Sequence, residues 1–246
     1  MVPCASISVG GVDIIKTKKL PVSDLRISMG TENSSSASFA VHNIFDLKAR
    51  KVDSDVKNLF KPGSIVSVNL GYGSTTKTVF YGYIADITTE FTEDPVIMIT
   101  ALDVISLIQK RERRNYTYQS KNYSEILSTM LSEYPKCYKS LEIDKTNDSL
   151  EVPIQNGKDM DYIRKVICRN TGKQFMVLAG KVYLRDFDDV SKPIMDLEWG
   201  SGFLSFTESK VLVNEKYVFM GQEKDTKKTF SQSDKAESDS LAAIFK

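Results

Sequence analysis

Residues 61–103 read KPGSIVSVNLGYGSTTKTVFYGYIADITTEFTEDPVIMITALD, and this stretch decides the fold. Three runs in it are rich in β-branched and aromatic residues and alternate between apolar and polar positions, which is typical of β-strands with one buried face. The runs cover Ile65–Leu70, Thr78–Glu90 and Val96–Ala101. A turn is predicted at Lys61–Gly63 and a polar connection at Gly71–Lys77. Gly82, inside the second run, predicts a bulge or a close approach of another backbone.

The residues before this stretch also predict strands. Ile7–Val9 and Val12–Ile14 flank Gly10-Gly11, and two glycines suit a tight hairpin turn because such turns need positive φ. Two further alternating runs follow, centred on Ile27 and Phe39. The segment Asn43–Phe60 is less periodic and rich in charge, so we expect an exposed excursion.

After residue 103 the hydrophobic period changes to that of helices. Three helices are predicted, at Val104–Ile108, Asn122–Tyr134 and Asp159–Asn170. Strands then resume with a hairpin around Ala179-Gly180-Lys181. Its two strands are predicted at Phe175–Leu178 and Val182–Leu184, and two later strands at Phe203–Glu208 and Val211–Met220. Strands and helices that are segregated along the chain indicate an α+β protein, here mainly β.

This pattern predicts four parts. Residues 1–105 form a first β domain, 106–174 a helical insertion with connecting strands, 175–220 the strands of a second β part, and 221–246 a polar linker with a short helix or tail.

Composition narrows the function classes. The 33 basic and 32 acidic residues give a net charge of +1, which argues against general coating of nucleic acid. The three cysteines are widely spaced, as expected for reduced thiols in a protein made in a cytosol. Residues 1–10 lack a signal-peptide pattern, and there is no apolar run of about 18 residues, so no membrane partner is expected.

Motifs that carry chemistry are missing from the sequence. The single histidine, His42, follows an alternating strand and is interpreted as a strand-end polar residue rather than a catalytic base. The sequence contains no catalytic motif of the forms G-x-S-x-G, H-E-x-x-H or C-x-x-C. It also lacks a complete phosphate-binding loop. The carboxylates Asp186, Asp188 and Asp189 do not complete a calcium loop and are interpreted as a solvated loop. We therefore expect no enzyme activity, cofactor or metal.

One basic run stands out. Lys110, Arg111, Arg113 and Arg114 lie just before Tyr116 and Tyr118. Basic residues beside aromatic ones can bind single-stranded nucleic acid. In a chain of balanced charge, the simpler interpretation is a charged surface, and we take these four residues as candidates for an interface or for the lining of a lumen.

Residues 60–185 resemble the phage late control protein D family, whose members show a "pGs-v-v-lGY … vF-GyI-di … itA-D---L" run. The matching segments are Lys61–Val68, Gly71-Tyr72, Val79–Ile87, Val96–Asp103 with Leu107, Tyr116–Tyr118, Tyr123–Leu127, Val152–Asn156, Asp159–Arg164, Thr171–Lys173 and Phe175–Leu184. The family includes baseplate hubs of contractile phages, the hub part of type VI secretion spikes, and hubs of phage-tail bacteriocins (tailocins).

The resemblance implies a homotrimer in which each subunit carries two barrel-like domains with the fold of tail-tube protein. Three subunits then imitate a six-fold ring, so a hexameric tube stacks on one side and a trimeric spike on the other. The implied partners are the chain itself, tail tube protein, central spike protein, other baseplate proteins and the tape measure protein. Such a virion component is made in the bacterial cytoplasm, assembled into a particle and released by lysis.

The chain departs from this family in two places. Relatives place Ser or Thr where Lys158 precedes the second long helix, and they continue beyond the point that corresponds to residue 246. A short hub, or a second barrel that another chain completes, would account for the second difference. Two other classes stay open from the sequence alone: a tail-associated cell-wall hydrolase and a surface-binding adhesin module.

Overall fold

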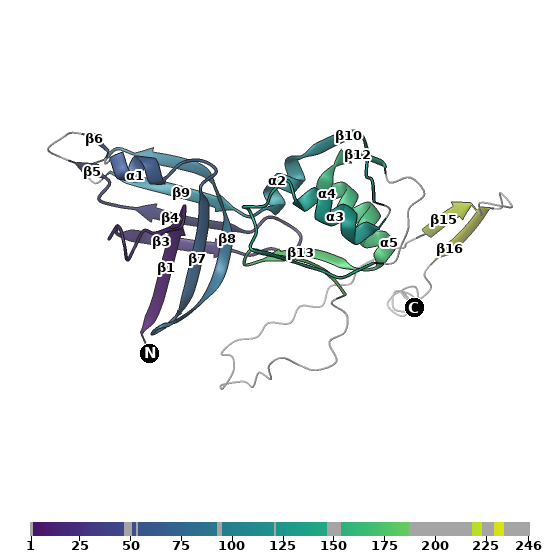
Figure 1. Cartoon of the computed structure of the whole chain (residues 1–246), viewed down its shortest axis with the longest axis horizontal. Helices are drawn as coiled ribbons and strands as arrows, with labels where there is room; N and C mark the ends of the chain where they lie inside the picture. Colours follow the sequence, from purple (N-terminus) through teal and green to yellow (C-terminus); the bar gives the residue numbers. More distant parts are fainter. Residues whose placement is uncertain are drawn as a thin grey trace, which may run out of the picture. The chain divides into compact units, whose positions relative to one another are not determined.

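The computed structural model of the chain describes residues 2–46, 51–52, 54–92, 95–120, 122–146, 154–186, 218–222 and 229–233. The chain divides into two compact units, Met1–Val190 and Ser191–Lys246. More of the described residues lie in strands than in helices, which confirms the mainly β class that the sequence predicts (Figure 1).

A seven-stranded antiparallel sheet in the order β2-β1-β7-β8-β9-β4-β3 forms the first half of the first unit. Its strands are β1 (Pro3–Val9), β2 (Val12–Asp13), β3 (Val22–Ser28), β4 (Ser36–Val41), β7 (Ile65–Tyr72), β8 (Thr75–Glu90) and β9 (Val96–Leu102). The predicted hairpin between β1 and β2 is confirmed, with φ of +58° at Gly10 and +85° at Gly11. The polar connection predicted at Gly71–Lys77 is instead mostly strand, because β7 and β8 pair up to Tyr72 and Thr75.

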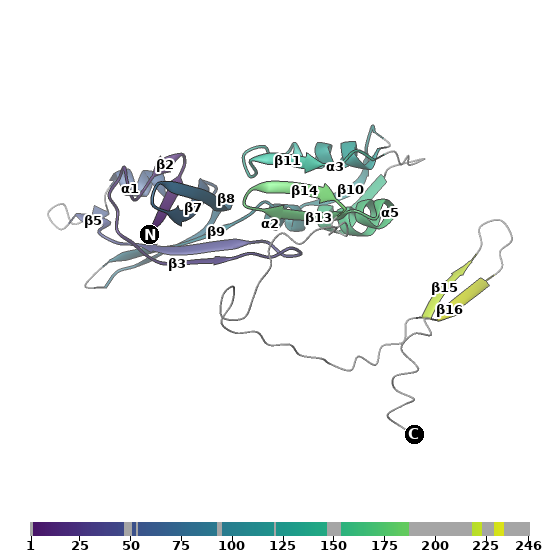
Figure 2. The same ribbon diagram turned by 90° about the horizontal axis from the view of Figure 1, so that it is seen from below.

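The sheet folds over its own apolar face. β8 pairs with β7 through its first half and with β9 through its second half, so the strand bridges the two sides of the sheet. Figure 2 shows β3 on one side, with β1, β7 and β8 on the other. The core between them is fully buried; its largest members include Ile7, Phe39, Phe80, Ile84 and Ile99.

The segment predicted as an exposed excursion, Asn43–Phe60, contains ordered elements that close one end of this core. These are β5 (Phe45–Asp46), β6 (Lys51–Val52) and α1 (Ser54–Leu59). Val56 and Phe60 are buried in the core, 7% and 5% exposed. Ile44 is also fully buried in this core, and Leu59 packs against it. The prediction was wrong because the charged residues between these apolar positions hide the helical period.

The resemblance implied a barrel, and the sheet is open in the residues that the structure describes. Its end strands, β2 and β3, pair with β1 and β4 and not with each other. The edge at β3 carries a bulge between Ser23 and Arg26, where Asp24 has φ of +54°. A bulge of this kind is one way in which proteins limit uncontrolled pairing at a sheet edge.

The close approach predicted at Gly82 is confirmed. A Cβ at this position would lie 2.2 Å from the backbone oxygen of Leu102, the residue that pairs with Tyr83 across β8 and β9. We expect Gly82→Ala to lower the free energy of unfolding by about 1–3 kcal/mol, because the two strands must separate to admit the methyl group. Urea denaturation measures this, with Thr76→Ala, an exposed change on the same strand, as the control expected to stay within about 0.5 kcal/mol. Equal midpoints for both variants would contradict the close approach.

The second half of the first unit has its own core. Its elements are α2 (Ile105–Lys110), β10 (Glu112–Thr117), α3 (Tyr123–Leu131), β11 (Ser140–Ile143), β12 (Ile154–Lys158), β13 (Gln174–Leu178) and β14 (Lys181–Arg185). A helix also runs from Asp159 to Thr171 as α4 (Asp159–Tyr162), a π-helical segment (Ile163–Cys168) and α5 (Arg169–Thr171). Helices and strands share one cluster that includes Ile126, Ile163 and Val182.

Local signals fix several ends of these elements. Asn122 caps α3 by accepting a hydrogen bond from the Ser124 amide, as predicted. Glu125 does not complete a capping box, because its carboxylate accepts a hydrogen bond from the Ser120 hydroxyl. Gly172, with φ of +69°, ends the second long helix as predicted.

In the second unit the structure describes one antiparallel pair, β15 (Val218–Gln222) and β16 (Thr229–Ser233). β16 lies in the part predicted to be a polar linker, Gly221–Lys246, so that prediction was wrong for these residues. The strand predicted at Phe203–Glu208 and most of that at Val211–Met220 lie outside the described residues.

Among the residues that are described, no helix combines the length and the apolar character needed to cross a bilayer.

Candidate functional site

The basic run divides into exposed and buried members. Lys110 ends α2 and is exposed, and Arg114 has a side chain that is 87% exposed with Glu112 3.8 Å away. Arg111 is half-exposed and its Nη2 lies 2.9 Å from Glu133 Oε2. These three residues remain available at the surface for an interface.

Arg113 is different, because its side chain is only 5% exposed and forms a buried ion-pair network. Its Nε and Nη2 lie 2.8 Å and 3.1 Å from the two carboxylate oxygens of Asp159, and its Nη1 lies 2.8 Å from Glu133 Oε1. Asp159 also accepts a hydrogen bond of 2.8 Å from Gln155 Nε2. The network joins β10, β12, α4 and the segment after α3, so Arg113 stabilises the fold and does not face a partner or a lumen.

The network also sets the pKa values of its members. Burial by itself lowers the pKa of the Arg113 guanidinium, but its hydrogen bonds to Asp159 and Glu133 outweigh that effect and hold the pKa above its usual value. Burial raises the pKa of the Tyr118 phenol, which donates a hydrogen bond to Gln155 Oε1. Both shifts keep the guanidinium of Arg113 protonated and the phenol of Tyr118 neutral near neutral pH, as expected of a structural network.

The other sequence candidates are not brought together. His42 follows the last residue of β4, as predicted, and its Nε2 lies 2.9 Å from the Ser23 hydroxyl. Asp186 is exposed, whereas Asp188 and Asp189 lie outside the described residues. Among the described residues, no three His, Cys, Asp or Glu side chains are grouped so that they could hold a metal ion.

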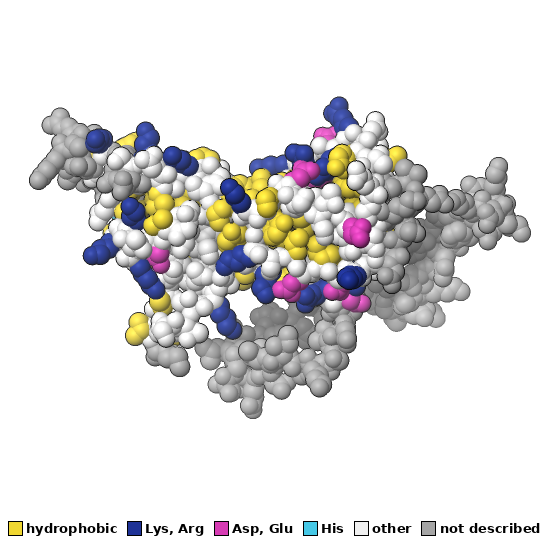
Figure 3. Space-filling view, viewed as in Figure 1, with side chains coloured by type: hydrophobic (Ala, Val, Ile, Leu, Met, Phe, Trp, Pro, Cys, Tyr) yellow, Lys and Arg dark blue, Asp and Glu magenta, His cyan; other side chains and the backbone are white. Residues whose placement is uncertain are grey.

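The sequence did not reveal an apolar tip where β1, β7 and β8 extend past the core. Val2, Leu70 and Tyr72 are 76%, 37% and 61% exposed. Leu70 and Tyr72 continue the alternation that buries Val68, so they lie on the core-side face at a place where nothing in the described residues covers it. Hydrophobic side chains are visible at this end of the sheet in Figure 3. The outer edge of β1 is also unpaired over Pro3–Ser6 within the described strands.

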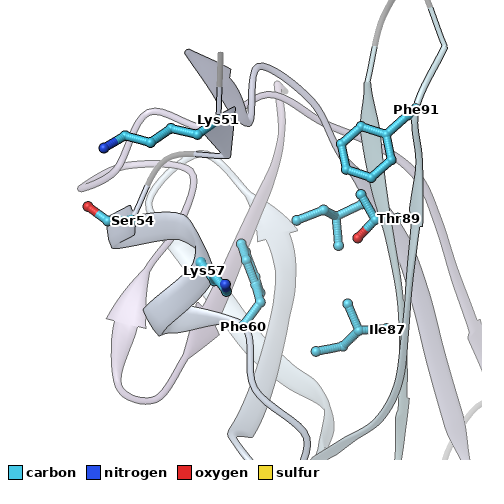
Figure 4. Close-up of a pocket in the computed structure, with 8 residues that line it drawn as sticks. Lys51, Ser54, Lys57, Phe60, Ile87, Thr89 and Phe91 are labelled. Atoms are coloured by element: carbon cyan, nitrogen blue, oxygen red, sulfur yellow. The ribbon is translucent and has the colours of Figure 1, made fainter. Parts of the chain in front are cut away.

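A groove of about 470 Å³ is a second feature that the sequence did not indicate. It lies between α1 and the second half of β8 (Figure 4), with Phe60 on one wall and Ile87, Thr89 and Phe91 on the other. Phe91 is 68% exposed. Lys51, Ser54 and Lys57 form the polar rim, and Ile97 from β9 completes the apolar lining.

Two solved structures with this fold are tail proteins. The chain aligns with the tail protein from Neisseria meningitidis MC58 at a TM-score of 0.61 and 12% identity, covering 97% of this chain and 69% of that one. It aligns with the 43 kDa tail protein of prophage MuSo2 from Shewanella oneidensis at a TM-score of 0.54 and 12% identity, covering 75% of this chain and 56% of that one. At such identities the likeness defines the fold, which is that of tail proteins, as the resemblance predicted.

The family follows from the sequence match. Residues 2–212 match the family model described as Alg8 N-terminal domain, and the chain belongs to this family. No curated protein matches the chain. The assignment to late control protein D hubs remains a prediction.

Proposed function

We propose that the chain is a structural baseplate hub of a contractile phage tail or phage-tail-like particle. In this role it forms a homotrimeric ring that adapts a six-fold tail tube to a three-fold spike, and it contacts the tube, the spike and other baseplate proteins. The observation that carries the proposal is the tail-protein fold over 97% of the chain. The resemblance of residues 60–185 to late control protein D supports the finer assignment.

The exposed features of the first sheet are consistent with ring assembly. The unpaired edge of β1 and the apolar tip of Val2, Leu70 and Tyr72 offer backbone groups and apolar surface at one place. A contact between this place and a different surface of the next subunit is heterologous, and heterologous contacts generate a ring when the rotation between subunits closes. We assign Lys110, Arg111 and Arg114 to the rim of a subunit or tube contact.

Native mass spectrometry of the purified chain tests the ring. We expect a species of three subunits, and we expect the double variant Leu70→Asp/Tyr72→Asp to shift it to monomer, because two charges would enter an apolar contact. Thr76→Asp, on the opposite face of the same tip, is the matched control and should leave the trimer intact. A wild-type chain that stays monomeric at every concentration would count against the ring.

We also propose that the chain acts without catalysis. Two observations support this proposal: the sequence contains none of the catalytic motifs considered above, and the charged groups of Arg113, Asp159 and Glu133 bind one another in a structural network. Incubation of the purified chain with cell-wall peptidoglycan should release no soluble fragments. Release of such fragments, abolished by a single carboxylate substitution, would favour a tail-associated hydrolase instead.

A further inference from the structure

The second half of β8 has one paired and one open edge. Residues Asp86–Glu90 pair with β9 along their whole length. At the opposite edge of β8, pairing with β7 ends at Tyr83. Backbone hydrogen bonds between Ile84 and the turn before β7 lengthen this paired edge by one residue only. No strand in the described part of the chain pairs with this side of Asp86–Glu90. An open edge of this length presents unpaired amide and carbonyl groups to an incoming strand.

The open segment also borders an apolar groove. Ile87 and Thr89, which belong to it, point with Phe91 toward Phe60 across the groove in Figure 4. Positions 87, 89 and 91 alternate along the chain, so side chains at every second position of a strand added here would point the same way. Recognition by strand addition combines these two elements: main-chain hydrogen bonds for affinity and pockets for alternate side chains.

Charge decides which strand fits. Asp86 and Glu90 are exposed, and their partners on β9 are the uncharged Thr100 and Val96. The only hydrogen bond of the Asp86 carboxylate in the described residues comes from the Thr88 hydroxyl, at 3.2 Å. Opposite charges directly across two strands stabilise the pair, and like charges destabilise it. Lys51 and Lys57 lie at the rim of the groove, whereas Asp86 and Glu90 alternate with the groove-facing residues and so lie on the opposite face of β8. Lysine or arginine is therefore favoured at the intervening positions of the added strand, which lie on the face of Asp86 and Glu90.

We propose that the β8 edge, defined as Asp86–Glu90 together with the groove beside α1, binds an extended segment of a partner protein. In this segment apolar residues, which enter the groove, alternate with basic residues, which lie opposite Asp86 and Glu90. A second copy of β8 is a poor occupant, because pairing two such edges would bring Asp86 and Glu90 of each copy close to one another. The inference does not depend on the trimer, since the isolated chain carries the whole β8 edge.

Peptide binding to the full chain tests the proposal. The probe is a short acetylated peptide that alternates valine with lysine, and the comparison peptide alternates valine with glutamate. We expect saturable binding of the valine–lysine peptide, with shifts of the amide resonances of Asp86–Glu90, and about tenfold weaker binding of the valine–glutamate peptide. A valine–lysine peptide with methylated backbone nitrogens on one edge should lose binding, because it keeps its side chains but not its donors.

A charge-reversed variant separates strand addition from general attraction between charges. Asp86→Lys/Glu90→Lys should reverse the preference, so that the valine–glutamate peptide binds more tightly. Glu32→Lys, an exposed change in the loop between β3 and β4, should leave the preference unchanged. Unchanged preference in the double variant, binding of the methylated peptide with undiminished affinity, or resonance shifts elsewhere on the sheet would each overturn the proposal.

Discussion

Arg113→Ala is expected to lower the free energy of unfolding by about 3–5 kcal/mol. The cause is the group left behind: Asp159 is fully buried, and without the guanidinium its carboxylate keeps a single side-chain hydrogen bond, from Gln155. An uncompensated buried charge costs far more than the ion pair contributes. Because the network ties β10 and β12 to α4, we expect the loss to appear as unfolding of the second half of the first unit.

The adjacent residue provides the control. Arg114→Ala removes the same kind of side chain one position away, where it is 87% exposed and 3.8 Å from Glu112, and should cost less than about 0.5 kcal/mol. The double variant Arg113→Met/Asp159→Leu should recover much of the loss, since it removes both charges together. Chemical denaturation followed by circular dichroism measures all three. Similar stability of the Arg113 and Arg114 variants would contradict the buried network.

Ile84→Asp is expected to prevent folding of the first sheet. Ile84 is fully buried in its core, at the point where β8 passes from β7 to β9, and it is bonded through its backbone to the turn before β7. A carboxylate placed there has no cation within the apolar cluster to offset its desolvation. Native proteins are stable by only about 5–15 kcal/mol, so a penalty of this kind removes most or all of the margin. Val68→Asp should act in the same way.

Ile84→Val is the matched control for this prediction, because it keeps the residue apolar and should cost only about 0.5–1.5 kcal/mol. Far-ultraviolet circular dichroism and limited proteolysis distinguish the two variants. A cooperative unfolding transition of wild-type midpoint in the aspartate variant would mean that Ile84 does not lie in the core.

Local periodicity predicted most strands and the two long helices, because it depends on neighbours along the chain. The alternation of Ala37, Phe39 and Val41 is sufficient to identify β4, and all three are fully buried. Gly82 predicts a close backbone approach, although the sequence alone does not identify its partner, Leu102.

Features set by distant residues were not predictable in this way. Arg113 belongs to a charged run that suggests a solvated surface, and its partner Asp159 is 46 positions away. Whether the sheet closes depends on whether β2 and β3, its two end strands, pair with each other. No local sequence pattern encodes this strand order. The sequence did not predict the apolar tip or the groove either. Tyr72 and Phe91 differ from the aromatic residues of the core only in whether other residues cover them. A signal was available at the tip, where the apolar alternation of β7 continues past the core to Leu70 and Tyr72.

The most direct test of the structural role is electron cryomicroscopy of tail particles that contain this chain. The account predicts three copies around the tail axis, between the tube and the spike, with the folded sheets next to one another. Particles that assemble fully without the chain, or a single copy located away from the axis, would contradict it.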